Sequence, residues 1–494
     1  MRIRLSPETL PGVQRKQNPK EKHLRPKIDV QCELEFPISR LALTQAYYAK
    51  YQAISKILDA TPAIVALAHG DLEHALEQVA RAQPPTCERS VYTSDNVLRI
   101  LLVQVIEGLS LRETVVRIDD SPALRRFARL QTRPMMDFTT LCKLKNAIRP
   151  ATWKQINQRL ARYAVRAERI TGEALRLDTT AVETNVHWPT DSSLLWDSYR
   201  VLARWIEQAR ELDPALVGSG RLHPRRAKRE ALAIARKAAK RGPDAEALKP
   251  LYRSLLGRVE GICDWALGIA QGLRQRIASG RYGEWKGVSA QALHEEITAS
   301  HALARRVVDQ AQRRVLRGET VPNDEKLFSL FEPHTELLKR GKAGKDIEFG
   351  HMIQLQQGKE KFITGYAVYE KKPFEPALLE PALESHRALF GADPAQLTAD
   401  KGYYESMEAL RRLEQRIAMV SIAKKGTRTA AETAREHEPL FRHAQAFRAG
   451  IEGTISFLKR VLRLGRCFNK GWDHFVTTVG MTVFAHNLIV LARH

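Results

Sequence analysis

Apolar residues recur at helical spacing along the first third of this chain, and turn signals divide that stretch into several helices. In 94–107 the apolar side chains fall on one side of the predicted helix. Gly108 breaks the pattern, and Ser110 with Glu113 then forms the signature of a capping box. Two helices are predicted over 47–80 and 94–107. A third begins at Leu111, and a fourth begins at Pro122. A fifth is capped by Thr139 and ends at about Ile148.

Alternating, β-rich segments occur in two blocks, and a long helical stretch separates them. Helical spacing without strand signals extends from about 194 to 316. A loop of this length is unusual inside a domain, so the stretch is interpreted as a separate module inserted into an α/β domain. Strands are predicted over 174–182, 184–188, 347–355, 361–369, 396–400 and 418–423, and further helices over 405–416, 448–462 and 472–492.

The helices around residue 110 have the outline of a DNA-binding motif. A helix, a tight turn with glycine and a second helix is the order of a helix-turn-helix. The second helix carries Arg112 and Arg117, which are candidate DNA contacts. A plain helical bundle with a solvated basic face fits the same spacing, and both interpretations stay open.

The charge balance points to a polyanionic partner. Lys and Arg number 79 against 56 Asp and Glu, a formal net charge of +23, and 44% of the residues are hydrophobic. This composition excludes wholesale disorder and favours a protein that acts on nucleic acid. Basic residues gather in 1–27 and in 221–241, where nine Lys or Arg face the single acid Glu230. The candidate phosphate contacts of the second segment are Arg225, Arg226, Lys228 and Arg229.

Cysteine usage and hydropathy predict an intracellular protein. Five widely spaced cysteines without a C-x-x-C pair predict neither a disulfide framework nor a structural zinc site. Residues 1–27 lack the apolar stretch of a signal peptide. The apolar run 475–492 contains His486 and Asn487, so we expect a buried helix rather than a membrane span.

Three acidic residues stand where an α/β fold gathers functional side chains. Asp178 lies within an apolar strand, Asp400 ends a strand, and Glu452 lies on a helix between Ile451 and Ile455, on or near its buried face. Converging carboxylates repel one another and need a cation, and oxygen ligands suit Mg²⁺ or Mn²⁺. Two such ions serve in-line phosphoryl transfer.

Each acid also has a structural explanation. In that interpretation Asp178 pairs with a buried Arg or Lys, Asp400 caps a turn, and Glu452 is a surface residue. The glycine- and lysine-rich segment 341–345 is not a phosphate loop, because Asp346 stands where Ser or Thr is needed. No nucleotide cofactor is therefore predicted.

The sequence around the three acids resembles bacterial insertion-sequence transposases of the DDE type. The third motif of these enzymes has a spacing that Arg448, Glu452 and Lys459 keep, whereas Gln445 replaces its tyrosine. The subgroup is similar to the poorly classified (ISNCY-like) insertion sequences. The segments similar to the three acidic motifs are Leu175–Leu194, Thr398–Tyr404 and Phe447–Lys459, and 340–350, 107–113 and 137–141 resemble other recurring segments.

The resemblance implies an RNase-H-like, retroviral-integrase-like catalytic core. Asp178, Asp400 and Glu452 are then the catalytic residues and the ligands of two Mg²⁺ or Mn²⁺ ions. The implied reaction is metal-dependent cleavage at the ends of a mobile element, followed by transfer of the 3′-hydroxyls into target DNA. The implied DNA contacts near the site are Arg448, Lys459, Lys401 and Tyr403.

The partners and parts of the protein follow from the same resemblance. Double-stranded DNA at the element ends and target, a homodimer or larger synaptic complex, no membrane and a cytoplasmic, nucleoid-associated location are expected. A resolvase-like or repair-type nuclease of the same fold and an inactive DNA-binding relic remain alternatives. The predicted parts are a basic arm (1–45), an all-α, helix-turn-helix-like DNA-binding domain (46–165), an α/β RNase-H-like catalytic domain (166–200 and 345–494) and a helical basic insertion (201–344).

Overall fold

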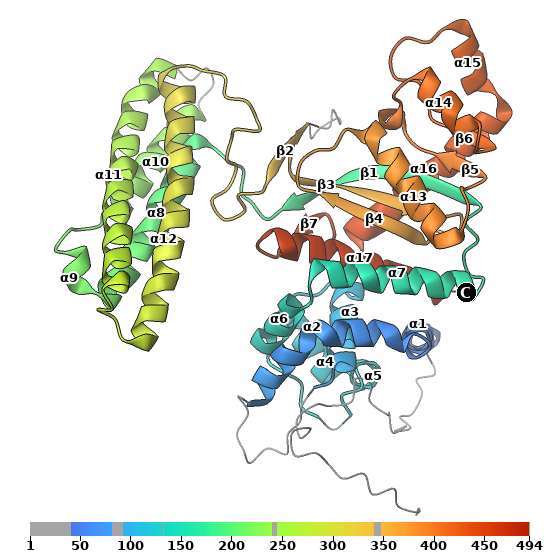
Figure 1. Cartoon of the computed structure of the whole chain (residues 1–494), viewed down its shortest axis with the longest axis horizontal. Coiled ribbons are helices and arrows are strands. Elements are labelled where there is room, and N and C mark those ends of the chain that lie inside the picture. The colour runs from blue at the N-terminus through green and yellow to red at the C-terminus, as the bar shows by residue number, and fades with distance from the viewer. Residues whose placement is uncertain (1–40, 82–91, 132, 240–244, 340–346, 494) are drawn as a thin grey trace, which may run out of the picture. The chain divides into compact units, whose positions relative to one another are not determined.

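The structure of this chain, a computed structural model, describes residues 41–81, 92–131, 133–239, 245–339 and 347–493. These residues belong to two units, and Figure 1 labels their elements. Unit 1 consists of Met1–Ala167 with Phe484–His494, and unit 2 of Glu168–Val483. The predicted basic arm over 1–27 and the segment 341–345 lie outside the described residues.

Unit 1 is built from helices, and its local start signals act largely as predicted. The capping box is confirmed: Ser110 Oγ accepts from Glu113 N at 3.3 Å, and Glu113 Oε2 accepts from Ser110 N at 2.8 Å. The predicted Thr139 cap is wrong, because Asp137 caps this helix and accepts from Thr139 N at 2.8 Å. The helices are α1 (Ala42–Asp59), α2 (Pro62–Arg81), α3 (Ser94–Ile106), α4 (Leu111–Asp120), α5 (Pro122–Phe127), α6 (Phe138–Ala147) and α7 (Pro150–Arg166).

Helix α3 is the centre of unit 1 rather than an amphipathic surface helix. Every one of its residues is buried, including its charged ones. Arg99 donates to Asp95 and Asp59 at 2.9 Å each, and Arg129 donates to the same two carboxylates at 2.9 and 2.6 Å. These reciprocal ion pairs explain how a charged turn is tolerated inside the bundle.

A mixed sheet with helices around it forms one part of unit 2, with β1 near the start of the unit and the other strands near its C-terminal end. Strand β1 pairs antiparallel with β3 and parallel with β5, and β5 pairs parallel with β6. The predicted strand over 184–188 is wrong, because β1 is one strand that ends at Thr184. The strands are β1 (Ala174–Thr184), β2 (Glu336–Lys339), β3 (Ile347–Gln357), β4 (Ile363–Tyr369), β5 (Gln396–Thr398), β6 (Met419–Ser421) and β7 (Arg466–Cys467).

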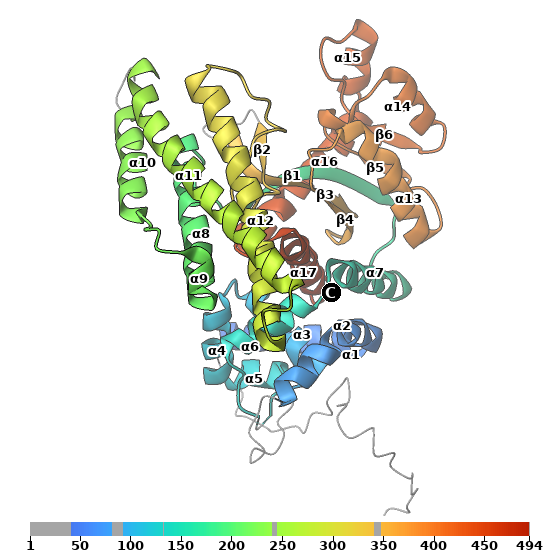
Figure 2. The same ribbon diagram turned by 60° about the vertical axis from the view of Figure 1, so that its left-hand side comes forward.

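Helices follow the strands of the second block and carry part of the core. Leucines of β1 and β5 pack with leucines of α13 and α14 on one face of the sheet. On β1, helix α16 makes contact along the strand, as both ribbon views indicate (Figures 1 and 2). These helices are α13 (Leu379–Phe390), α14 (Met407–Glu414), α15 (Ala430–His437), α16 (Pro439–Arg460) and α17 (Trp472–Leu491), with the short turns η3 (Glu375–Leu378) and η4 (Lys401–Tyr403).

The apolar helix near residue 480 is buried, as expected for 475–492. Among the described helices, α17 is long and apolar enough to cross a membrane, and 83% of its apolar stretch lies inside the protein. The free thiols of Cys142, Cys263 and Cys467 agree with the prediction that these cysteines form no disulfide framework.

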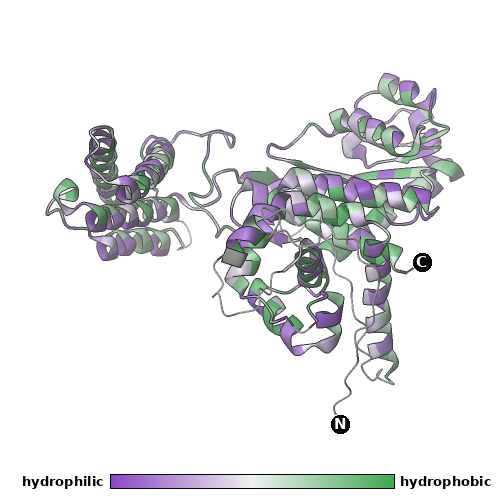
Figure 3. Ribbon diagram, turned by 60° about the horizontal axis from the view of Figure 1, so that its bottom comes forward, coloured by the Kyte–Doolittle hydropathy of each residue, from purple (hydrophilic) through white to green (hydrophobic). Residues whose placement is uncertain are grey.

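The predicted helical stretch between the strand blocks is confirmed. It has an apolar core of its own, which includes Leu202, Val259 and Val307, and Figure 3 shows hydrophilic residues along its helices. Helix α10 packs against α8 and α11, and Figure 2 shows it beside α11. The helices are α8 (Asp191–Leu212), α9 (Pro214–Val217), α10 (Pro224–Ala238), α11 (Ala245–Ala278) and α12 (Glu284–Ala311), followed by a π-helical turn, η2 (Gln312–Leu316).

Candidate active site

The first acid lies in the middle of the sheet. Asp178 is on β1, opposite Leu355 of β3, and its side chain is 12% exposed. Its Oδ1 accepts the backbone N–H of Thr179 at 2.8 Å. A long, apolar strand therefore holds this carboxylate at a fixed and largely dry position.

The second acid stands at the end of the neighbouring strand. Strands β1 and β5 run parallel with Arg176 opposite Thr398, so the positions two residues further along each chain are Asp178 and Asp400. Asp400 begins η4, and its Oδ1 accepts the N–H of Gly402 at 2.7 Å. Asp400 thus caps its turn, as its structural explanation requires, and also lies beside the strand that carries Asp178.

Helix α16 brings the third acid and a cation to the same strand. Arg448 Nη1 lies 3.8 Å from Asp178 Oδ2, and Arg448 Nη2 lies 3.1 Å from Glu452 Oε1. The Glu452 side chain is 64% exposed, so the prediction that it lies on or near the buried face of its helix is wrong. It stands one turn from Arg448, and the guanidinium joins the first and third acids.

A buried arginine that sequence reasoning missed fastens α16 to the sheet. Arg176 Nε donates to Gln357 Oε1 at 2.9 Å, and Nη1 donates to the carbonyl of Phe447 at 2.7 Å. Burial lowers the pKa of Arg176 to about 10. Gly450 leaves room for this guanidinium, because a Cβ there would collide with it. An arginine between two apolar strand residues was the available signal.

The electrostatics of the site disfavour a bare carboxylate at Asp178. Burial, and then the charge of Asp400, raises the pKa of Asp178 to about 6. Arg448 and the Thr179 N–H oppose this increase, and the charge of Glu452 adds to it. A carboxyl held in this way gains from a nearby cation.

The side chains at the site are ligands of the kind that hard divalent cations prefer. The three side chains offer carboxylate oxygens only, and the guanidinium of Arg448 already places a cation between Asp178 and Glu452. Within the described residues no three Asp, Glu, His or Cys side chains lie close enough together to hold a metal ion as they stand. At least one of the three side chains therefore has to move before all three can share one ion.

The predicted DNA contacts near the acids differ in accessibility. Lys401 is exposed, and Arg448 and Lys459 are half-buried. Tyr403 is 1% exposed, and its hydroxyl accepts from Gln354 Nε2 at 3.2 Å. Its predicted role as a DNA contact is contradicted, because the ring belongs to the core between β3 and η4. Gln445, at the position of the missing tyrosine, donates to the Ser421 carbonyl at 2.9 Å.

The basic residues predicted on α10 all face solvent. Glu230, the acid of this helix, accepts from Arg258 of α11 at 2.9 and 2.8 Å, which leaves the outer face of α10 positive. In unit 1, Arg117 is exposed and Arg112 is exposed with its guanidinium 4.3 Å from the centre of the Phe138 ring. The exposed residues of α10 are Arg225, Arg226, Lys228 and Arg229.

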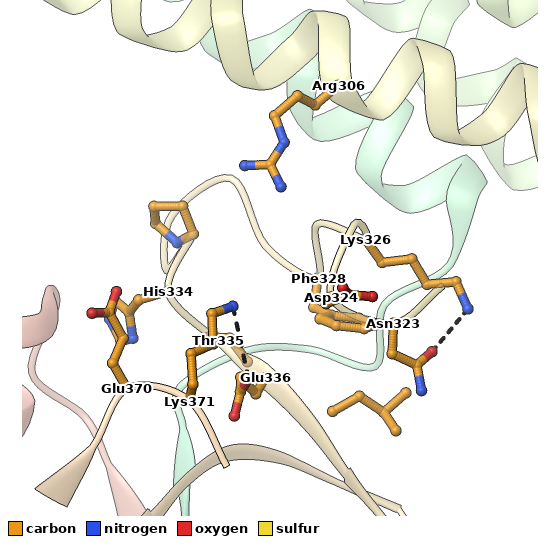
Figure 4. Close-up of a pocket in the computed structure, with 12 residues that line it drawn as sticks. Arg306, Asn323, Asp324, Lys326, Phe328, His334, Thr335, Glu336, Glu370 and Lys371 are labelled. Carbon is orange, nitrogen blue, oxygen red and sulfur yellow. Dashed lines mark hydrogen bonds and ion pairs between the residues drawn. The ribbon is translucent and has the colours of Figure 1, made fainter. Parts of the chain in front are cut away.

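The described part of the chain also contains a cavity of about 380 Å³, which is separate from the three acids (Figure 4). Its lining includes Arg306 of α12 and Lys326, together with Glu336 of β2 and Lys371. Lys371 lies 3.7 Å from Glu336, so part of the positive charge is compensated. None of the three acids lines it, and the carboxylate cluster is the stronger candidate for phosphoryl transfer.

Comparison with known protein families finds two matching domains in this chain. Residues 54–147 match the model of a transposase domain, DUF772, and residues 324–488 match the transposase DDE domain. The second match includes Asp400 and Glu452, while Asp178 lies before it, beyond the helical stretch. No curated protein and no solved structure matches the chain. DDE transposases use divalent metal ions and bind DNA, and the two matches identify this chain as a transposase with a DDE domain that catalyses DNA transposition.

Proposed function

We propose that Asp178, Asp400 and Glu452 are the catalytic acids, and that they cut DNA at the ends of the mobile element and transfer its 3′-hydroxyls into target DNA. The observation that carries the proposal is the convergence of three elements: parallel β1 and β5 align two acids, and Arg448 links the third to the first. The mixed sheet, with an antiparallel block followed by parallel strands, supports an RNase-H-like core.

The acids provide oxygen ligands for two Mg²⁺ or Mn²⁺ ions. When bound, such ions neutralise the carboxylates, activate the attacking hydroxyl and stabilise the leaving 3′-oxygen. Asp178 and Asp400 keep their positions through the N–H groups of Thr179 and Gly402. With cations bound, they would position the reacting phosphate for in-line attack by water, which breaks the P–O3′ bond and leaves a 3′-hydroxyl and a 5′-phosphate. That 3′-hydroxyl would then attack a phosphodiester of the target DNA and release a target 3′-hydroxyl.

Helix α16 supplies the mobile part of the site. Glu452 is exposed and bound to Arg448, so a rotation of its side chain toward Asp178 completes the ligand set. The same rotation releases Arg448, whose guanidinium can then bind a DNA phosphate beside the acids. Lys459, two turns further along α16, and Lys401, next to Asp400, extend this phosphate contact.

The remaining parts are assigned by charge and shape. The outer face of α10 tracks a phosphate backbone, since its acid is already paired with Arg258. Arg112 and Arg117 on α4 belong to a helix-turn-helix-like DNA-binding domain. We assign 1–45 to a basic arm, 46–165 to DNA binding, 166–200 with 345–494 to catalysis and 201–344 to the insertion.

Two features concern the assembly in the cell. Both element ends have to be handled together, so the active form is a homodimer or larger synaptic complex on double-stranded DNA. We place it in the cytoplasm on the bacterial nucleoid and in the poorly classified (ISNCY-like) insertion-sequence subgroup.

The test uses purified protein, Mg²⁺ and linear DNA that carries the sequences flanking this gene. Joined products are expected, and D178N, D400N and E452Q should abolish cleavage while DNA binding persists. E405Q, a nearby exposed glutamate outside the site, is the matched control and should retain activity. Cleavage without joining would identify a nuclease instead. Activity that survives D178N, D400N or E452Q would show that the acids are wrongly assigned.

A further inference from the structure

A fourth carboxylate lies behind the acids of the proposed site. Glu375 begins η3, the short turn after β4. Its Oε1 accepts a hydrogen bond from Thr179 Oγ1 at 2.6 Å, and Thr179 follows Asp178 on β1. Neighbouring residues of a strand point to opposite faces, so Glu375 approaches β1 from the face away from Arg448.

The other oxygen of Glu375 meets the turn that carries the second acid. A Cβ on Gly402 would collide with Glu375 Oε2 and would lie 2.8 Å from Asp400 Oδ1. Only a glycine therefore lets this carboxylate and the Asp400 turn approach so closely. One side chain thus contacts the residue after Asp178 and the turn after Asp400.

Buried polar groups hold η3 and η4 together around this contact. Gln354 of β3 lies opposite Thr179, and its Nε2 donates to the Leu378 carbonyl at 3.4 Å and to the Tyr403 hydroxyl at 3.2 Å. Burial, and then the charges of Asp178, Glu375 and Asp400, holds the pKa of Tyr403 well above its ordinary value. Tyr403 therefore interacts electrostatically with all three carboxylates.

Glu375 forms no ion pair within the described part of the chain. Other half-buried acids of unit 2 do form one, for example Asp393 with Arg387. The structure instead shows Glu375 in contact with the two segments that carry Asp178 and Asp400.

We propose that Glu375 is a positioning residue of the catalytic site, which fixes the Asp178–Thr179 segment of β1 against the Asp400–Gly402 turn so that both acids are aligned for divalent cations. This inference rests on the proposed site. Partners that orient metal ligands through a hydrogen bond typically change metal affinity about 10- to 100-fold when they are removed.

The experiment measures binding of Mn²⁺ alone to the full chain, by the loss of the free-ion electron paramagnetic resonance signal. E375A and T179V each remove the hydrogen bond and should weaken Mn²⁺ binding about tenfold. The double variant should be no weaker than either single variant, because both remove one interaction. T179S and E375Q keep a donor and an acceptor and should bind Mn²⁺ within about twofold of the wild type.

The control variants E360A, D178N and D400N distinguish failure of this inference from failure of the proposed site. E360A removes a similar pair, in which Thr171 Oγ1 donates to Glu360 Oε1 at 3.0 Å at the turn between β3 and β4, and should leave Mn²⁺ binding unchanged. Wild-type binding by both E375A and T179V, with loss in D178N and D400N, would overturn the inference alone. E375Q as weak as E375A would overturn the positioning role, because charge would then be essential. Wild-type binding by D178N and D400N would overturn the proposed site itself.

Discussion

Replacing Asp178 with asparagine should stabilise the metal-free protein at neutral pH while it abolishes catalysis. Burial and the charge of Asp400 raise the pKa of this carboxyl to about 6. Asparagine has nearly the same shape, and its Oδ1 can still accept the N–H of Thr179. The substitution therefore removes the charge and keeps the hydrogen bond.

The magnitude follows from the two pKa values. In the unfolded chain the Asp178 carboxyl ionises near its ordinary pKa of 3.8, whereas in the folded protein its pKa is about 6. The folded state therefore binds this proton more tightly, and ionisation lowers stability as the pH rises from about 4 through about 6. The difference corresponds to about 3 kcal/mol at pH 7. The gain from D178N should be close to this value at pH 7 and fall to about 0.6 kcal/mol at pH 4.

The assay is calorimetric unfolding in the presence of a chelator at pH 7 and pH 4. Asp213 provides the opposite control, because Arg276 holds the pKa of its carboxyl at about 2 and Tyr282 also donates to it. D213N should therefore destabilise unit 2 at pH 7, and its effect should fade as the pH approaches 2. Asp178 and Asp213 both belong to unit 2. The unfolding transition that D213N shifts is therefore the transition in which the effect of D178N should be measured.

Two results would refute the reasoning. A D178N protein that is less stable than the wild type at pH 7 would mean that the ionised carboxylate is favoured where it lies. An equal gain at pH 4 and pH 7 would mean that the effect comes from packing, since the charge is absent at the lower pH.

Three further predictions concern other parts of the chain. S110A removes the cap of α4 and should lower the free energy of unfolding of unit 1 by about 1 kcal/mol in urea titrations, whereas S110N should retain most of it. G450A should push the Arg176 guanidinium off the Phe447 carbonyl and reduce cleavage about 100-fold with little change in DNA binding, as gel-shift and cleavage assays would show. R225Q with R229Q should reduce the slope of log affinity against log salt by about two, and an unchanged slope would exclude α10 from the DNA contact.

Local signals predicted much of the fold. The capping box at Ser110 and the alternation around Asp178 act over a few residues, so the sequence reveals them directly. Periodicity predicted helix α3 but not the burial of all its residues, because an apolar stripe does not show that the polar side of a helix is also covered. There Arg99 is buried together with Asp95 of the same helix and Asp59 of α1, and only the fold reveals the second partner.

The three acids of the candidate site could be predicted from the sequence, but the residues that hold the surrounding segments in place could not. Asp178, Asp400 and Glu452 stand out by position and motif. Glu375 contacts residues far away in the chain, and no local pattern marks it. Arg176 is marked locally only by its place between two apolar strand residues, which does not reveal its contact with α16. Tyr403 illustrates the converse error: an aromatic residue beside an acid suggested a DNA contact, and only the fold shows that its ring is in the core.

The helical insertion also sets an order of events during synthesis. Strand β1 ends at Thr184, and its partner β3 begins at Ile347, so the two cannot pair until the helices between them have left the ribosome. The insertion helices contact one another and can fold early, whereas the sheet closes late. Because Glu452 emerges long after Asp178, an unfinished chain lacks a complete set of acids. With the acids proposed above, cutting of DNA near the enzyme's own gene would have to wait until synthesis has passed α16.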